Sequence, residues 1–104
     1  MSQKLFIVSV DANATTVQKN AFTAFLRNDN KGLGFWHHTS NEWVIHDIEG
    51  QLTAVRLRDK ISELMGSTEC LVMQVRPLDW AVKAQKSAHQ WLHTNINSKL
   101  WKDI

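Results

Sequence analysis

Cysteine, tyrosine and long apolar runs are scarce or missing in this chain of 104 residues. Cys70 is the single cysteine, so no disulfide can form within the chain, and this fits a reducing cytoplasm. No run approaches the roughly 20 apolar residues of a membrane-spanning helix. The apolar run of residues 5–10 is too short for the core of a secretion signal. We therefore expect a cytoplasmic protein that does not enter a membrane.

A strong charge of one sign is also missing, because the net charge is only +2. This balance gives no general argument for binding nucleic acid. The charge is uneven, however, since residues 80–104 carry a net charge of +3 and residues 1–79 carry −1. Lysines interleaved with tryptophans are typical of surfaces that contact phosphates and stack bases, although a solvated helix face gives the same pattern. The candidate nucleic-acid-binding residues are Lys83, Lys86, Lys99, Trp101 and Lys102.

Tryptophan, by contrast, is abundant, and two of the five tryptophans lie in the most aromatic stretch of the chain, residues 35–46. Aromatic and β-branched residues on both sides of Thr39-Ser40-Asn41 predict a β-hairpin. A turn of two or four residues pairs the arms so that alternate residues share a face. One face then carries Trp36, Trp43 and Ile45, and the other carries Phe35, His37, Val44 and His46.

Strand and helix patterns alternate along the rest of the chain. Residues 5–10 are apolar on both alternating faces and predict a central strand, and residues 70–76 predict another. Apolar residues at helical spacing predict helices between residues 15 and 28, between Thr53 and Gly66, and from Asp79 to about Asn95. The predicted order is β-α-β-β-α-β followed by an extra helix.

This order predicts an α+β fold of the ferredoxin-like, split β-α-β type, with a four-stranded antiparallel sheet and an extra C-terminal helix. We expect one domain over residues 1–104, with a core at 4–76 and a helical extension at 77–104. Right-handed crossovers place the two internal helices on one face of the sheet.

The other face of this sheet is apolar and needs a cover, which the third helix or a second copy of the chain could supply. We therefore expect a homodimer in which the third helix reaches onto its own or its partner's sheet. The expected interface residues are Phe35, His37, Val44, Val72, Trp80 and Trp91.

Several short patterns within about residues 4–76 resemble a known group of proteins. They are Val8-Ser9-Val10-Asp11, Trp36-His37, Trp43-Val44-Ile45, Leu52-Thr53-Ala54, Leu57-Arg58-Asp59-Lys60-Ile61 and Leu71-Val72-Met73-Gln74-Val75. Together they resemble the SinR-like small proteins of bacteria and phages. That group is similar to the second small CRISPR-associated protein and to virulence-associated protein D.

The resemblance implies a ferredoxin-like homodimer associated with nucleic acid in a defence or toxin-antitoxin system. In the nuclease members, paired aspartates near the dimer axis bind a divalent metal, and Asp11 would take this catalytic and metal-binding role with Mg²⁺ or Mn²⁺. The sequence departs from the family pattern at Val10, where a tyrosine is usual. The residues by themselves leave open that Asp11 only hydrogen-bonds the turn after its strand.

Two classes of function are therefore open. The first is a nucleic-acid-associated homodimer that is a metal-dependent nuclease or its inactive relative. The second is a non-enzymatic interaction module, such as a phage-encoded inhibitor or antitoxin, that docks a larger machine through its aromatic sheet face. No cofactor is expected beyond the Mg²⁺ or Mn²⁺ of the first class.

Overall fold

The computed structural model describes residues 3–28, 32–77 and 79–96 of the chain. All strand pairs are antiparallel, and the strand order across the sheet is β2-β3-β1-β4. This confirms the predicted α+β class with a four-stranded antiparallel sheet. The elements are β1 (Lys4–Val10), α1 (Thr16–Asn28), β2 (Leu33–Thr39), β3 (Glu42–Asp47), α2 (Ala54–Met65), β4 (Cys70–Val75) and α3 (Lys86–Asn95).

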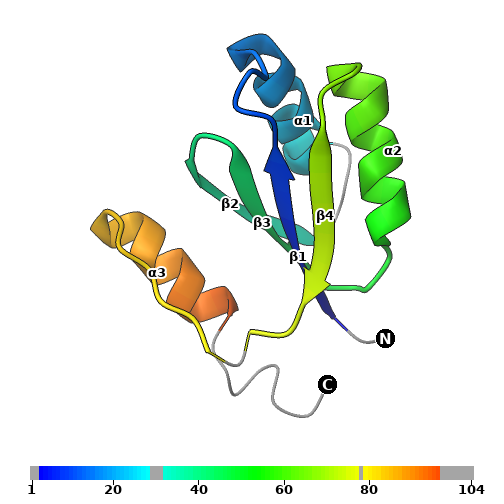
Figure 1. The fold of residues 1–104 in the computed structure, drawn as a ribbon. Coiled ribbons are helices and arrows are strands. Elements are labelled where there is room, and N and C mark those ends of the chain that lie inside the picture. The colour runs from blue at the N-terminus through cyan, green and yellow to red at the C-terminus, as the bar shows by residue number, and fades with distance from the viewer. Residues whose placement is uncertain (1–2, 29–31, 78, 97–104) are drawn as a thin grey trace.

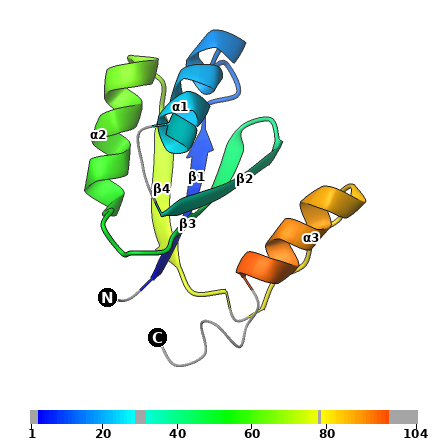
Figure 2. The same cartoon turned by 180° about the vertical axis from the view of Figure 1, so that it is seen from behind.

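The sheet separates two apolar clusters of unequal size. Helices α1 and α2 lie together on one face of the sheet, and α3 lies on the other (Figures 1 and 2). Alternate side chains of β1 lie on opposite faces of the sheet, since Phe6 and Val8 are buried under α1 and α2 while Leu5 is buried against α3. The larger cluster also contains Trp43 and Ile45 of β3.

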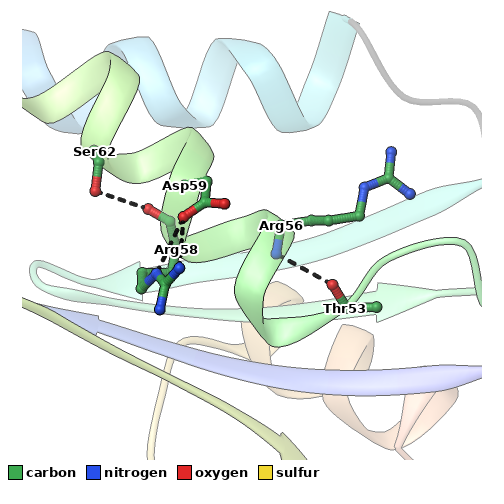
Figure 3. Close-up of polar contacts among 5 residues, drawn as sticks. All are labelled: Thr53, Arg56, Arg58, Asp59 and Ser62. Carbon is green, nitrogen blue, oxygen red and sulfur yellow. Dashed lines mark hydrogen bonds and ion pairs between the residues drawn. The ribbon is translucent and has the colours of Figure 1, made fainter.

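Helix α2 forms as its sequence predicts. The Thr53 hydroxyl oxygen accepts a hydrogen bond from the backbone N–H of Arg56 over 3.1 Å and so caps the first turn (Figure 3). Leu57, Ile61 and Met65 are buried along one side of the helix. Gly66 follows with a φ of 63°, a backbone angle that glycine adopts without strain.

A β-bulge in the hairpin makes the predicted assignment of its faces wrong. Trp36 pairs with Val44, but Thr39 pairs with Glu42, so the register shifts by one residue between the two pairs. The turn has two residues, one of the two lengths that the sequence allows, yet the extra residue in the bulge reverses which side chains share a face. Trp36 therefore lies on the α3 side of the sheet, on the face opposite to Trp43.

The third helix starts later than predicted, at Lys86 rather than next to Asp79. Trp80 and Val82 pack against the cluster beneath α3, while the residues between and after them are exposed. This alternation is that of an extended segment, so tertiary burial overrides the helical spacing that the sequence shows here. Residues 97–104 of the predicted extension lie outside the described residues.

Candidate functional site at the open edge of β4

Helix α3 covers only part of its face of the sheet. Ala88 and Leu92 pack on the β1–β3 side of that face, next to Leu5 and Trp36. Beyond this contact three apolar side chains stay exposed, at 36% for Ile7, 59% for Leu71 and 49% for Met73. Ile7 pairs with Met73 in the β1–β4 register, and Leu71 lies two residues along on the same face. We call these three residues the apolar strip.

Polar contacts fix α3 where it is. The indole N–H of Trp36 donates to the carbonyl oxygen of Ala88 over 3.0 Å. The Asn95 side-chain amide donates to the Trp91 carbonyl over 2.9 Å, which turns its oxygen toward His46. His46 Nδ1, on a buried ring, lies within hydrogen-bond distance of that oxygen, at 3.0 Å. The apolar strip is therefore left uncovered by a helix whose position is specified.

Strand β4 forms one edge of the sheet and pairs with β1. On β1 the Val10 N–H donates to Asn41 on the β3 side, and the next N–H, of Asp11, donates to Glu69 on the β4 side. Because N–H groups alternate in direction along a strand, the odd-numbered residues of β4 are bonded to β1. The open edge therefore presents the backbone groups of Cys70, Val72 and Gln74.

A groove of about 240 Å³ runs beside this edge between β4 and α2. The exposed side chain of Val55 gives it an apolar wall, and Arg58 gives it a positive charge. The Arg58 guanidinium contacts the Asp59 carboxylate over 2.9 Å, and both side chains are more than half exposed (Figure 3). The lining residues are Ala54, Val55, Arg58, Cys70, Leu71 and Val72.

Cys70 is the one thiol in the groove and is half-buried. Burial raises the pKa of the Cys70 thiol above its ordinary value, and the nearby positive charge of Arg58 offsets part of that rise. The protonated thiol is therefore favoured at neutral pH, and this form is a poor nucleophile.

Asp11 lies just after β1, at the strand end where the sequence predicts it. Its carboxylate accepts a hydrogen bond from the Asn13 backbone N–H over 2.9 Å, which closes a local turn. Thr15 and Gln18 line a cavity of about 280 Å³ beside it. Within residues 3–28, 32–77 and 79–96, no group of three or more His, Cys, Asp or Glu side chains is placed to hold a metal ion. The catalytic and metal-binding role of Asp11 stays a prediction.

The candidate nucleic-acid-binding residues are only partly described. Lys83 lines a cavity of about 260 Å³ together with Trp36, His38, Thr39 and Gln85. Lys86 begins α3 and is exposed. Lys99, Trp101 and Lys102 lie outside the described residues.

The expected interface residues do not share one surface. Val44, Trp80 and Trp91 pack against the cluster beneath α3. Phe35 and Val72 instead pack against the cluster under α1 and α2, so their predicted place on the open face is wrong.

His37 is also misplaced by the prediction. Its ring stacks on Trp43 with centroids 4.2 Å apart, so it does not share a face with His46. The apolar strip was missed as a site, although alternate apolar residues at Leu71 and Met73 are visible in the sequence.

No helix in the described part of the chain has the length and apolar content to cross a bilayer. The chain matches no protein-family model, no curated protein and no solved structure.

Proposed function

We propose that this protein is a non-enzymatic interaction module that binds an extended polypeptide segment along the open edge of β4. The observation that carries this proposal is the coincidence of three features at one strand: outward backbone groups that pair with no strand in the described part of the chain, the apolar strip and the groove. An added strand would bond to the backbone of Cys70, Val72 and Gln74, with its alternate side chains on the strip and in the groove.

The composition of β4 supports strand addition. Edge strands usually carry a charged residue or a proline that opposes pairing with another chain. Residues 70–75 contain neither, and their sequence is Cys-Leu-Val-Met-Gln-Val. A free edge of this composition favours pairing, either with a partner or by aggregation.

The proposal includes a ferredoxin-like arrangement of the sheet. β1 and β2 are joined by α1 and have β3 between them, while β3 and β4 are joined by α2 and have β1 between them. Two interleaved crossovers of this kind support the split β-α-β plan. The similarity to the SinR-like group and a cytoplasmic location stay predictions.

A proline at Gln74 tests strand addition directly. The Gln74 N–H points away from β1 and its side chain is exposed, so Gln74→Pro removes an edge donor and leaves the β1–β4 ladder intact. Gln74→Thr is the matched control, because it changes the side chain and keeps the N–H.

Short peptides are then selected by display on the wild-type protein, and their binding affinities for the wild type and for both variants are measured. We expect them to bind the wild type and Gln74→Thr at least about tenfold more tightly than Gln74→Pro, which corresponds to about 1.4 kcal/mol. Selected peptides that bind all three proteins equally would exclude the β4 edge as the binding site.

Association with nucleic acid is a second candidate function, favoured by the cavity beside α3. Lys83 and His38 line this cavity with the Trp36 ring, and its described lining contains no carboxylate. We propose that Lys83 and Lys86 contact backbone phosphates there.

The affinity for single-stranded RNA or DNA should then fall steeply with added salt and should fall in a Lys83→Ala/Lys86→Ala variant. A Lys19→Ala/Lys60→Ala variant, which removes the same charge elsewhere, is the control. Equal losses of affinity in both variants would mean that the cavity beside α3 does not bind nucleic acid.

Nuclease activity is tested separately, at Asp11. Cleavage of nucleic acid with Mg²⁺ or Mn²⁺ that disappears in Asp11→Ala would assign nuclease chemistry to Asp11.

A further inference from the structure

We infer that the segment bound at the β4 edge is β4 of a second copy of this chain, paired antiparallel about a two-fold axis so that two sheets become one. This inference rests on the proposed function, because it names the partner for the same edge. Symmetry, backbone direction and charge each restrict how two copies can meet.

Symmetry fixes which residues can lie opposite one another. A two-fold axis perpendicular to the sheet keeps each face of the sheet on the same side in both copies. Residues paired across antiparallel strands also point to the same face. The two residue numbers of a pair must therefore be both even or both odd. An axis through Val72 meets this condition and places Cys70 opposite Gln74 of the second copy.

Backbone direction favours this register over its neighbours. Cys70, Val72 and Gln74 point their N–H and C=O groups outward, and the axis at Val72 pairs all of them within the two strands. An axis at Met73 would instead place Cys70 opposite Arg76, which lies beyond the end of β4. The Val72 register satisfies the backbone of the open edge most completely.

The apolar strip is covered in the same register. Leu71 lies opposite Met73 of the second copy at a non-hydrogen-bonded pair, where side chains on antiparallel strands approach most closely. Each copy contributes both residues, so the strips of the two copies join across the axis. The 59% exposure of Leu71 and the 49% exposure of Met73 would then fall together.

Charge favours a second copy in antiparallel orientation. Glu69 precedes β4, Arg76 follows it, and both residues are exposed. Antiparallel pairing about Val72 sets Glu69 of one copy opposite Val75 and diagonal to Arg76 of the other, on the opposite face of the sheet, so ends of opposite charge come together; parallel pairing would set like-charged ends together. The α2 helix flanks β4 (Figure 1), so the groove of one copy would face the groove of the other, with each Arg58 balanced by the Asp59 carboxylate of its own helix.

This dimer separates the two copies of Asp11. Asp11 bonds to Glu69, which is three residues from Val72 along β4. At about 3.4 Å per residue on each side of the axis, the two carboxylates would lie at least about 20 Å apart. A metal shared between them, which the resemblance implies, is incompatible with this interface.

The mass of the protein in solution tests the inference. We expect sedimentation equilibrium to give twice 12.0 kDa for the wild type and for Gln74→Thr, and 12.0 kDa for Gln74→Pro and Met73→Lys. Val17→Lys, at an apolar residue that is 79% exposed on α1, is the control and should remain dimeric. Circular dichroism confirms that each variant is folded. A monomeric wild type, or a folded Gln74→Pro that remains dimeric, would overturn the inference.

Cross-linking tests the register independently. In a Cys70→Ser background, the double variant Leu71→Cys/Met73→Cys should form a covalent dimer with oxidised glutathione, because close cross-strand pairs bring their Cβ atoms near disulfide distance. Leu71→Cys or Met73→Cys alone should remain largely uncross-linked. Efficient cross-linking of Met73→Cys alone would place the axis at Met73 and overturn the Val72 register.

These outcomes separate the partner from the function. A monomeric wild type whose display peptides still distinguish Gln74→Pro from Gln74→Thr would keep the proposed function and reject the second copy as the partner. A dimer that is insensitive to both Gln74→Pro and Met73→Lys would place the dimer interface elsewhere and reject the inference.

Discussion

At the scale of single residues, Asp47 organises the connection between β3 and α2. Its buried carboxylate accepts hydrogen bonds from the backbone N–H of Leu52 over 2.7 Å and of Gly50 over 3.0 Å. Gly50 has a φ of 70°, which lets the chain reverse within this short turn. The Lys4 ammonium donates to the Leu52 carbonyl over 2.7 Å and ties the same turn to β1.

Removing this carboxylate should destabilise the protein strongly. We expect Asp47→Ala to lower the free energy of unfolding by about 3 kcal/mol, because the buried N–H of Leu52 loses a charged acceptor. Asp47→Asn keeps one oxygen acceptor and should lose less. Urea unfolding measures both variants, and a loss below about 1 kcal/mol for Asp47→Ala would contradict the role given to this residue.

The Cys70 thiol gives a prediction about pH. Its pKa is raised by burial, so its alkylation by iodoacetamide should have a pH midpoint above that of the same chain in denaturant. Because the folded state favours the neutral thiol, the resulting stability is complete below the ordinary pKa and is lost as pH rises through the raised one. Arg58→Ala should move the midpoint further up. A pH midpoint of alkylation in the folded protein at or below that of the denatured chain would contradict a raised Cys70 pKa.

Residue-level chemistry is where sequence reasoning works best. The roles of Thr53 and Gly66 follow from hydrogen bonds and backbone angles within α2 itself, and the structure confirms both. The stacking of His37 on Trp43 depends on an unsignalled shift of register, and the sequence could not show it. Structural features that depend on neighbouring residues of one element can be predicted from the sequence alone. Features that depend on how a second segment packs against the first cannot.

At the scale of elements, the hairpin and α3 show what patterning leaves undetermined. The hairpin and its aromatic arms were predicted correctly, with the turn left at two or four residues, but one extra residue in a bulge moved Trp36 to the opposite face. The start of α3 was missed because Trp80 occurs at helical spacing and yet packs from an extended segment. In both places the burial of an aromatic ring decides between conformations that the sequence pattern cannot separate.

The docking of α3 depends on Trp36, and this can be tested. Trp36→Phe keeps an aromatic ring in the cluster and removes the indole N–H that donates to Ala88. We expect stability to fall by about 1 kcal/mol, with faster amide exchange across α3 than across α2. Trp91→Phe, which replaces another indole of the same cluster by a smaller phenyl ring, is the control. Unchanged exchange in α3 would mean that this hydrogen bond does not hold the helix.

At the scale of the whole molecule, the two faces of the sheet are covered unequally. The placement of α1 and α2 on one face follows from the order of elements and the right-handedness of crossovers. The coverage of the other face could not be derived, because it depends on where α3 docks after an irregular segment. The sequence predicted an apolar face that needs a cover but placed Phe35, His37 and Val72 on it, whereas the exposed apolar residues there are Ile7, Leu71 and Met73.

Amide exchange along β4, followed residue by residue in the wild-type protein, tests most directly whether a second strand occupies this edge. The Leu71 and Met73 amides bond to β1 in every state of the folded chain and serve as an internal standard. If a second strand occupies the edge, the outward amides of Val72 and Gln74 should exchange as slowly as those of Leu71 and Met73. Their exchange should become faster when the protein is diluted and the two copies separate. Rapid exchange of Val72 and Gln74 at every concentration, beside protected Leu71 and Met73, would contradict a second strand at this edge.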